Sequence, residues 1–363
     1  MTTPRAYRLG PELTLVGPDA SRRLPTIIAV RGRSCFVLAD RDGRRAAARP
    51  LAALGEEVPD VRLMPFEGEC TEAAIERIAT ESEPFDVLLA VGGGKVLDAA
   101  KAAASAAGIP CVTLPTSAAT CAAYTPLSIL HEPGGAYVES RRLSQPVAAM
   151  ILDPHLILTA PPRLLAAGIA DAVARAFDTL LAARIAVPTS TAGLSLAVCS
   201  AYLETCLLPL GEQALGDNAL GETTDAFVRV VEACVLGAGL AGETGARFFG
   251  RSFSHAVGYA LSHIVDPASV LHGEAVGLGI LVHCILDSQP PVTIERMLAY
   301  FEAWSLPKSL SAIGVRGIDE GTALRMAELA LGYLDLERAV PFPVGAKDLL
   351  WALRRLEAIA NAP

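Results

Sequence analysis

The sequence is poor in aromatic and charged residues, and its cysteines never form a closely spaced pair. Of 363 residues, 5% are aromatic and 19% are charged, whereas 52% are hydrophobic. A chain this apolar can bury a large core, which excludes intrinsic disorder. The eight cysteines are scattered without a Cys-x-x-Cys pair. This spacing excludes a zinc-ribbon or disulfide framework and predicts reduced, mostly buried thiols.

Dense positive clusters and signal-like apolar segments are also missing. The net charge is −9, the isoelectric point is near 5.3, and Lys and Arg form no run longer than Arg-Arg pairs. This charge balance argues against binding to a nucleic-acid backbone. The N-terminal residues have no apolar core, and no uncharged apolar run reaches the roughly 18–20 residues that cross a bilayer. We therefore expect a cytoplasmic protein with no nucleic-acid or membrane partner.

The length and the apolar pattern predict two domains, because a chain of 363 residues usually divides. In the first part, short apolar runs alternate with helix-like segments, which is typical of a parallel α/β domain. These runs are TIIAV at 26–30, CFVLAD at 35–40, DVLLAV at 86–91 and PCVTLP at 110–115. Long Ala/Leu segments then predict an all-helical domain. Pro and Gly punctuation places the boundary near 155–165, so we predict domains at 1–160 and 161–363.

A glycine turn follows the run DVLLAV, which leads directly into Gly92, Gly93, Gly94 and Lys95 before a helix-forming stretch. Such a turn lets a phosphate approach the free N–H groups of the helix N-terminus. The spacing matches neither a Walker A loop nor the GxGxxG fingerprint. The turn is therefore compatible with a phosphate site or with a purely structural role. Asp98, in the next helical turn, fits a simple helix-dipole contact.

Two further features lie where parallel sheets bind ligands. The stretch LPTSAATCAAYTPLSIL at 114–130 places hydroxyl groups, among them Thr116 and Thr125, after a predicted strand. An ordinary Ser/Thr-rich turn is the alternative. Asp40 ends the run CFVLAD, where a carboxylate binds the ribose hydroxyls of NAD and repels the additional phosphate of NADP. Arginines follow at 41, 44 and 45, so NADP stays open.

Three of the six histidines, His255, His263 and His272, lie within 18 residues. A helix, a loop and a second helix starting at His272 would bring two imidazoles to one centre. Two histidines do not complete a metal site, so an oxygen ligand is required. Asp171 is the candidate, because a carboxylate in a long apolar run is costly to bury unless it is paired or bound to a metal. A salt bridge to Arg175, one turn further on, is the alternative.

Five motifs together resemble the metal-dependent, iron-containing type of alcohol dehydrogenase, in particular the glycerol dehydrogenase-like branch, over nearly the whole length. They are GGGKVLDAAK, PTSAATCAAYTPLSIL, APPRLLAAGIADAVARAFD, FSHAVGYAL and LHGEAVGLGIL. The resemblance implies an α/β dinucleotide-binding domain, a helical domain and an active site between them. It implies a divalent metal on Asp171, His255 and His272. The cofactor contacts that it implies are Asp40, Gly93, Gly94, Lys95, Asp98, Thr116, Thr125 and Leu127.

Several positions depart from the family pattern. Iron-dependent members often carry a further histidine four residues after the aspartate, where this chain has Arg175, so a three-ligand zinc site is favoured over iron. His131 replaces a tyrosine that is common near the nicotinamide. His263 matches no ligand position, and we expect it in the core or behind the ligands. Cys121 stands where glycerol dehydrogenases carry an aspartate that contacts the polyol.

These departures bear on the substrate. Without a carboxylate at position 121, an acidic substrate escapes a repulsion of roughly 1–4 kcal/mol at 4 Å. The stretch around Cys121 is also similar to bacterial hydroxycarboxylate dehydrogenases. Arg175 is a candidate anchor for a substrate carboxylate, with pairing to Asp171 or Asp178 as the alternative. Glu274 either orients a metal ligand from behind or lies solvated at a helix end.

The sequence thus predicts a metal-dependent NAD(P)(H) oxidoreductase that interconverts a small alcohol and its carbonyl. A 2-hydroxy acid/2-oxo acid pair is the favoured substrate, NAD the favoured cofactor and a homo-oligomer the expected assembly. The alternatives are a glycerol or polyol dehydrogenase, a specialised aldehyde or imine reductase, a dehydroquinate synthase-like cyclase and an inactive nucleotide-binding protein. The cyclase is disfavoured because no phosphate-binding Lys or Arg is evident around 114–130 or 253–274. No side chain identifies itself as the proton donor.

Overall fold

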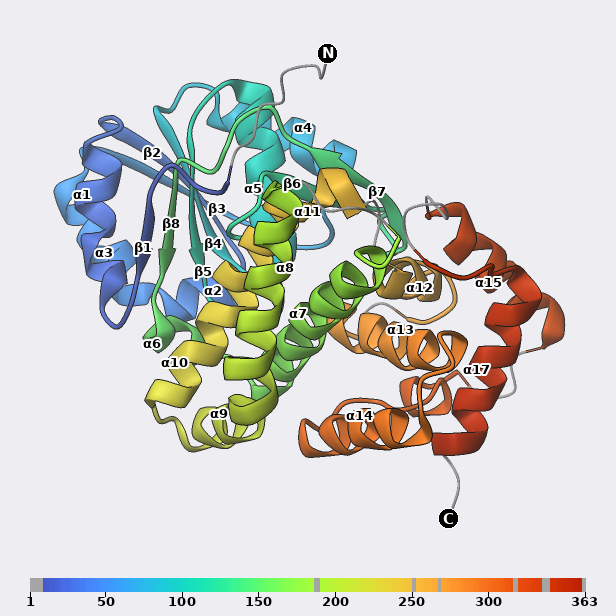
Figure 1. The fold of residues 1–363 in the computed structure, drawn as a ribbon. Coiled ribbons are helices and arrows are strands. Elements are labelled where there is room, and N and C mark those ends of the chain that lie inside the picture. Colours follow the sequence, from blue (N-terminus) through green and yellow to red (C-terminus); the bar gives the residue numbers. More distant parts are fainter. Residues whose placement is uncertain are drawn as a thin grey trace.

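A parallel sheet with helices forms the first part of the molecule, and helices alone form the rest (Figure 1). The expected fold class, an α/β N-terminal part followed by an all-α C-terminal part, is confirmed. The boundary between 1–160 and 161–363 stays a prediction. The computed structural model describes residues 9–185, 190–249, 253–266, 269–315, 319–334 and 340–360.

Six strands form the main sheet in the order β1-β8-β5-β4-β2-β3, and every neighbouring pair is parallel. The strands are β1 Thr14–Val16, β2 Ser34–Ala39, β3 Asp60–Pro65, β4 Val87–Gly92, β5 Cys111–Pro115 and β8 Ala149–Leu152. The chain runs from β2 outward to β3 and then returns past β2 to β4. Because the strand order reverses there, a crevice for a ligand opens beyond the carboxyl ends of β2 and β4.

Both faces of the sheet are buried, which is why its central strands read as continuous apolar runs. Phe36 and Leu88 belong to the core cluster that contains α4 and α5, whereas Val37 and Leu89 pack with α1 and α3 on the opposite face. The helices of this part are η1 Ala20–Arg23, α1 Leu24–Ala29, α2 Arg41–Ala46, α3 Ala48–Glu57, α4 Glu72–Ser82, α5 Gly94–Ala107 and α6 Pro154–Ile157. A separate antiparallel hairpin consists of β6 Leu127–His131 and β7 Tyr137–Arg142.

One expected strand is wrong. The run TIIAV at 26–30 lies in helix α1 and its C-cap. Pro25 occupies the first turn of this helix, where its missing N–H is not needed and its fixed φ favours helical geometry. Five β-branched or apolar residues are too few for periodicity to separate a strand from a buried helix turn. The run therefore covers the sheet rather than joining it.

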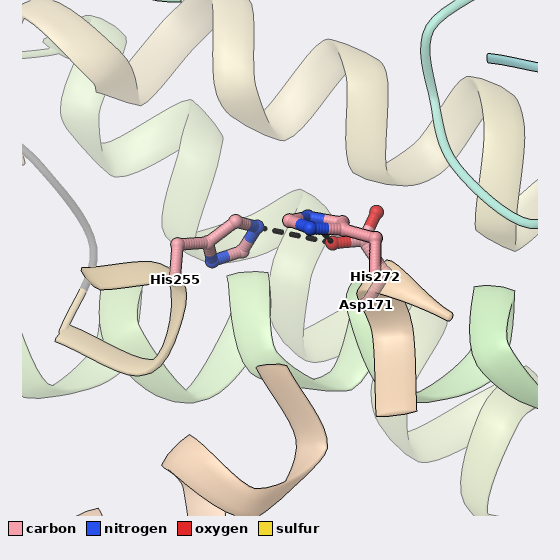
Figure 2. A group of neighbouring side chains, drawn as sticks. All are labelled: Asp171, His255 and His272. Atoms are coloured by element: carbon pink, nitrogen blue, oxygen red, sulfur yellow. Dashed lines mark hydrogen bonds and ion pairs between the residues drawn. The ribbon is translucent and has the colours of Figure 1, made fainter. Parts of the chain in front are cut away.

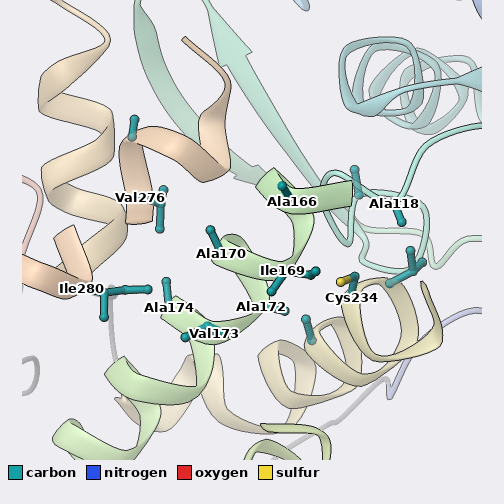
Figure 3. Close-up of a cluster of buried hydrophobic side chains, with 14 of the residues drawn as sticks. Ala118, Ala166, Ile169, Ala170, Ala172, Val173, Ala174, Cys234, Val276 and Ile280 are labelled. Atoms are coloured by element: carbon teal, nitrogen blue, oxygen red, sulfur yellow. The ribbon is translucent and has the colours of Figure 1, made fainter. Parts of the chain in front are cut away.

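The second part confirms the expected long helices. They are α7 Pro162–Ala182, α8 Ser190–Tyr202, η2 Leu203–Leu207, α9 Leu208–Leu220, α10 Asp225–Glu232, η3 Ala233–Gly237, α11 Ala238–Phe249, α12 Phe253–Leu261, α13 His272–Leu286, α14 Pro291–Ala303, η4 Ser311–Ile313, α15 Glu320–Gly332 and α17 Ala346–Ala360. Helix α7 runs through the middle of the molecule (Figure 1). In Figure 3, Val276 and Ile280 of α13 lie on one side of α7 and Cys234 on the other. The small alanines of α7 let these neighbours approach closely.

One helical stretch bears on the expectation that no uncharged apolar run reaches bilayer length. Residues Thr191–Leu220 form a continuous helix of 30 residues that contains an 18-residue window of mean hydropathy 1.5, and it is long and apolar enough to cross a membrane. A single helix of this kind is weak evidence, because helices of soluble proteins meet the same criteria. Glu204, Glu212 and Asp217 lie within it.

The contact between α7 and α13 is close enough to require glycine at position 273. A Cβ atom on Gly273 would lie 1.9 Å from the carbonyl oxygen of Ala167. We expect Gly273→Ala to lower the free energy of unfolding by about 1–3 kcal/mol, because the two helix backbones must separate. Urea denaturation measures this change. Gly216→Ala, in the exposed α9 with no atom near the added Cβ, should instead stabilise by about 0.5–1 kcal/mol. Equal effects of the two substitutions would contradict the close-contact argument.

Candidate active site

Three side chains from three different helices meet at one point. Asp171 lies on α7, His255 on α12 and His272 at the first position of α13. Asp171 Oδ1 is 3.0 Å from His255 Nε2 and 3.6 Å from His272 Nε2 (Figure 2). One ligand atom from each residue lies within 4.8 Å of the others. The structure thus brings together the three residues that the sequence proposes as metal ligands.

Glu274 fixes the chain where His272 enters α13. Its carboxylate accepts a hydrogen bond from the backbone N–H of Leu271 at 2.8 Å and pairs with Arg163 through Nε at 2.6 Å and Nη2 at 2.8 Å. Glu274 is buried, so the alternative of a solvated helix-end residue is wrong. Because it holds the residue before His272, Glu274 restrains the position of that imidazole.

The charge states of the cluster suit a cation. Burial raises the pKa of Asp171, but the hydrogen bond with His255 and the nearby positive groups leave it below its usual range. Partial desolvation in the cavity lowers the pKa of His272 and favours its neutral form, although its side chain is 37% exposed. Burial and Arg175 lower the pKa of His255, yet Asp171 and Asp178 outweigh them and raise it. Because a metal ion binds the unprotonated imidazole nitrogen, metal binding at His255 competes with protonation.

This donor set fits a divalent metal ion. One carboxylate and two imidazole nitrogens are a ligand combination of catalytic zinc sites, which keep one further position open. Asp171 and His255 are buried, and a buried carboxylate needs a cation or hydrogen bonds to offset its lost hydration. The alternative, a salt bridge between Asp171 and Arg175, is not among the ion pairs of the described residues, where Asp171 instead pairs with the two histidines.

At the sheet, Asp40 connects the end of β2 to the glycine turn after β4. Its carboxylate accepts hydrogen bonds from Gly43 N at 2.5 Å and from Gly93 N at 3.3 Å. Gly92 adopts φ +147°, and a Cβ there would lie 2.5 Å from Asp40 Oδ2. The turn therefore needs glycine both for its backbone conformation and for the approach of Asp40.

A cavity of about 390 Å³ joins the glycine turn to the Asp/His/His cluster. Its size falls within the roughly 300–1,000 Å³ that small-molecule sites occupy. The residues proposed from the sequence that line it are Asp40, Gly93, Gly94, Lys95, Asp98, Cys121, Thr125, Leu127, Asp171, Arg175, His255 and His272. Thr116 is buried outside this lining, and its N–H donates to the carbonyl oxygen of Gly92 at 3.1 Å. Thr116 thus supports the glycine turn through this backbone hydrogen bond.

Two more of the proposed cofactor residues form ion pairs within the protein. Lys95 pairs with Glu69, and both side chains line the cavity. Asp98 pairs with the buried Lys101 at 2.9 Å and accepts a hydrogen bond from Ile129 N at 3.2 Å. Lys101 Nζ also donates to the carbonyl oxygen of Ala122 at 2.7 Å. The Asp98–Lys101 pair therefore shapes the loop that contains Cys121 and Thr125.

Cys121 and Arg175 face the same cavity as the Asp/His/His cluster. Burial raises the pKa of the Cys121 thiol to about 12, so it is an uncharged group near pH 7. Arg175 Nη2 lies 3.5 Å from His255 Nε2. Among the described residues, no carboxylate forms an ion pair with Arg175, including Asp171 and Asp178, which pair with histidines.

Comparison with known proteins identifies the family of this chain. The family described as iron-containing alcohol dehydrogenase matches residues 11–154. The glycerol dehydrogenase of Thermotoga maritima is 32% identical over 293 residues, covering 80% of this chain and 79% of the relative. The chain belongs to the iron-containing alcohol dehydrogenase family.

Other relatives place this dehydrogenase in the glycerol dehydrogenase-like branch. Hydroxycarboxylate dehydrogenase A of Escherichia coli K12 is 34% identical over 277 residues, covering 75% of this chain and 76% of the relative. The crystal structure of a probable glycerol dehydrogenase from Sinorhizobium meliloti 1021 has a TM-score of 0.86 at 27% identity and covers 98% of this chain and 99% of that chain. The family resemblance seen in the sequence is confirmed. The chain is an NAD-dependent, metal-binding oxidoreductase that acts on CH–OH groups.

The two remaining histidines of interest have different surroundings in this dehydrogenase. His131 lines the cavity, and its buried Nδ1 has no hydrogen-bond partner among the described residues. His263 is exposed, with Nε2 2.9 Å from the Tyr333 hydroxyl. The expectation that His263 lies in the core or behind the ligands is therefore wrong. It follows the end of α12, where the chain turns outward to solvent.

Sequence reasoning missed several residues of the cavity. Tyr259 lines it one helix turn after His255, and its ring stacks on Tyr137 with centroids 3.9 Å apart. The i, i+4 spacing from His255 was a usable signal, because it puts both side chains on one face of a helix. Glu69 lies far along the chain from any recognised motif, so nothing in the sequence marks it.

Proposed function

We propose that this chain is an NAD(H)-dependent dehydrogenase or reductase of a small 2-hydroxy acid/2-oxo acid pair, with a divalent metal held by Asp171, His255 and His272. The observation that carries the proposal is the meeting of this cluster with the Arg175 guanidinium in one cavity. The cavity also reaches the glycine turn at the strand-order reversal, where dinucleotides bind in doubly wound sheets.

The ligand set supports zinc over iron. Three N and O donors with one open position suit catalytic zinc, and Arg175 stands one turn after Asp171, where a further histidine would complete a four-ligand site. When bound, a divalent ion supplies Lewis-acid polarisation of the substrate oxygen. The chain itself holds the donors on three packed helices and keeps Asp171 and His255 away from bulk water.

The cofactor side of the cavity supports NAD over NADP. Asp40 lies at the end of β2 beside the glycine turn, where a carboxylate binds ribose hydroxyls and repels an additional phosphate. Gly93, Gly94, Lys95 and Leu127 line the same space. The N–H groups at the start of α5 are available to a pyrophosphate.

Charge supports an acidic substrate. A metal ion on His255 and the guanidinium of Arg175, 3.5 Å from His255 Nε2, would place two positive groups side by side. A substrate carboxylate offsets that repulsion and accepts charge-assisted hydrogen bonds from Arg175. The neutral thiol of Cys121 adds no opposing negative charge. Glycerol or another polyol is the second candidate, because several of the similar proteins are named glycerol dehydrogenases.

We also propose a homo-oligomer in the cytoplasm. The helix Thr191–Leu220 exposes apolar side chains, with Leu194 42% and Leu220 74% exposed. A second copy of the chain would cover such groups. Light scattering on the purified protein measures the assembly, and a monomer at micromolar concentration would contradict the proposal.

A substrate panel tests the proposed activity. Zinc-loaded protein should oxidise NADH with 2-oxo acids at a higher kcat/KM than with hydroxyketones or simple aldehydes, because only the acids use Arg175. NADPH should be the poorer cofactor by tenfold or more, about 1.4 kcal/mol. Reaction with hydroxyketones alone would replace the acid substrate by a polyol-type one, and equal use of NADPH would overturn the assignment of Asp40.

A further inference from the structure

A buried carboxylate lies directly behind the Asp/His/His cluster. Asp178 is 6% exposed and follows Asp171 on α7 by seven residues. Seven residues are close to two helical turns, so both carboxylates project from one face of α7. Asp178 is not part of the metal-competent cluster, and the pairing with Arg175 that the sequence allowed is not among the ion pairs of the described residues.

Asp178 anchors the start of the helix that carries His255. Its oxygens accept hydrogen bonds from Ser254 N at 3.1 and 3.2 Å and from Ser254 Oγ at 2.8 Å. Ser254 is in the first turn of α12, where backbone N–H groups have no acceptor within the helix. A carboxylate at this end is also favoured by the helix dipole. Asp178 therefore fixes the position of the residue immediately before His255.

The same carboxylate faces the second nitrogen of the His255 imidazole. His255 Nε2 points to Asp171, while Nδ1 lies 3.7 Å from Asp178 Oδ2. An ionised carboxylate only accepts hydrogen bonds. With a metal ion between Asp171 and Nε2, Asp178 would therefore favour the tautomer with the proton on Nδ1, which leaves the Nε2 lone pair for that metal. Carboxylates in this position orient histidine ligands and raise their basicity in many metal sites.

A third helix completes the arrangement. His283 on α13 is buried, and its Nδ1 lies 3.6 Å from Asp178 Oδ1. The rings of Phe177 and Phe253 contact His283 edge-on, with centroids 6.3 and 6.0 Å away. Asp178 thus joins α7, α12 and α13, which are the helices that carry Asp171, His255 and His272.

We propose that Asp178 is a positioning residue for the metal centre, which fixes the Nδ1–H tautomer of His255 and the first turn of α12 and is itself held by the hydrogen bonds from Ser254. This inference rests on the proposed metal site. Its consequence is that metal affinity depends on a carboxylate that does not reach the ion.

The test is metal affinity in Asp178→Asn, which keeps the shape of the side chain and removes its charge. Metal-free full-length protein is titrated with Co²⁺, followed by visible absorption, and with Zn²⁺ in competition with a chromophoric chelator. We expect Zn²⁺ to bind about 10–100-fold more weakly and the Co²⁺ spectrum to change. The KM for NAD⁺ should stay within about twofold, because the cofactor residues lie on the sheet side of the cavity.

A matched control separates positioning from general packing. Asp287 ends α13 and pairs with Arg184, just beyond α7, at 2.7 and 2.8 Å; its side chain is 6% exposed. Asp287→Asn removes a comparably buried carboxylate between the same two helices, so it should lower the unfolding midpoint without changing Zn²⁺ affinity. An equal loss of affinity in both variants would reduce Asp178 to a packing role and overturn the proposal.

A second variant keeps the proposal testable if Asp178→Asn does not fold. Ser254→Ala removes the hydroxyl that donates to Asp178 at 2.8 Å and should weaken Zn²⁺ binding by about threefold or more, since Asp178 loses one support. Unchanged Zn²⁺ affinity in this variant, or in a folded Asp178→Asn, overturns this inference alone. Failure of the wild-type protein to bind one Zn²⁺ or Co²⁺ per chain would overturn the proposed metal site together with it.

Discussion

His272→Ala is expected to lower kcat for carbonyl reduction by about 10³-fold or more and to reduce the bound metal well below one ion per chain. Removal of one of three ligands leaves only Asp171 and His255, and two protein ligands hold a divalent ion weakly. A Lewis-acid contribution of about 4 kcal/mol corresponds to about 10³-fold at 1.36 kcal/mol per factor of ten. Metal analysis and steady-state kinetics on the same preparation measure both effects.

His263→Ala is the matched control for this experiment. His263 lies in the same segment as the ligands, but it is exposed and contacts the Tyr333 hydroxyl. Its replacement should change kcat by less than about threefold, as is usual for an exposed residue outside the site. Full activity in metal-free His272→Ala would contradict a mechanism that depends on the metal. A loss in His263→Ala as large as that in His272→Ala would show that the segment is merely sensitive to substitution.

Much of the fold could be read from the sequence where two signals coincided. The runs at 35–40 and 86–91 are apolar except for one terminal aspartate each, the first ends in Asp40 and the second leads into the glycine turn, and both form strands buried on two faces. The run at 26–30 had only its apolar character, and it proved helical. The edge strand β3 has the mixed sequence DVRLMP and is mostly exposed, so no apolar pattern marked it.

The candidate site also contains some residues that the sequence marks and others that it does not. Asp171, His255 and His272 could be proposed because a carboxylate in an apolar run and a cluster of histidines can be recognised in the sequence alone. Asp178 and His283 could not, because their role depends on three helices crossing at one place. For Glu274 the sequence allows two interpretations, a residue that orients a metal ligand or a solvated helix-end residue. Its pairing with Arg163 in the structure decides between them. Residues whose chemistry is visible within one helix or strand can therefore be predicted from the sequence. Residues that connect several helices can be recognised only once the packing of those helices is known.

Arg175→Met is expected to lower kcat/KM for a 2-oxo acid by about 10²–10³-fold while changing that for an uncharged hydroxyketone by less than about tenfold. Methionine keeps much of the apolar volume but has no donor for a carboxylate. Loss of one partner of a buried charge pair costs about 2–5 kcal/mol, and each 1.36 kcal/mol is a factor of ten. Kinetics with the two substrates on one metal-loaded preparation measure the difference.

The comparison between substrates is what gives this test its meaning, because Arg175 also lies 3.5 Å from His255 Nε2. If the guanidinium served mainly to hold His255, both substrates would lose activity equally and bound metal would fall. Arg175→Lys retains the charge but cannot form bidentate hydrogen bonds to a carboxylate. It should therefore recover part of the activity with the acid that Arg175→Met loses. A selective loss with the acid, partial recovery with lysine and unchanged metal content together require a carboxylate contact. An equal loss with both substrates would return Arg175 to a structural role and favour a polyol.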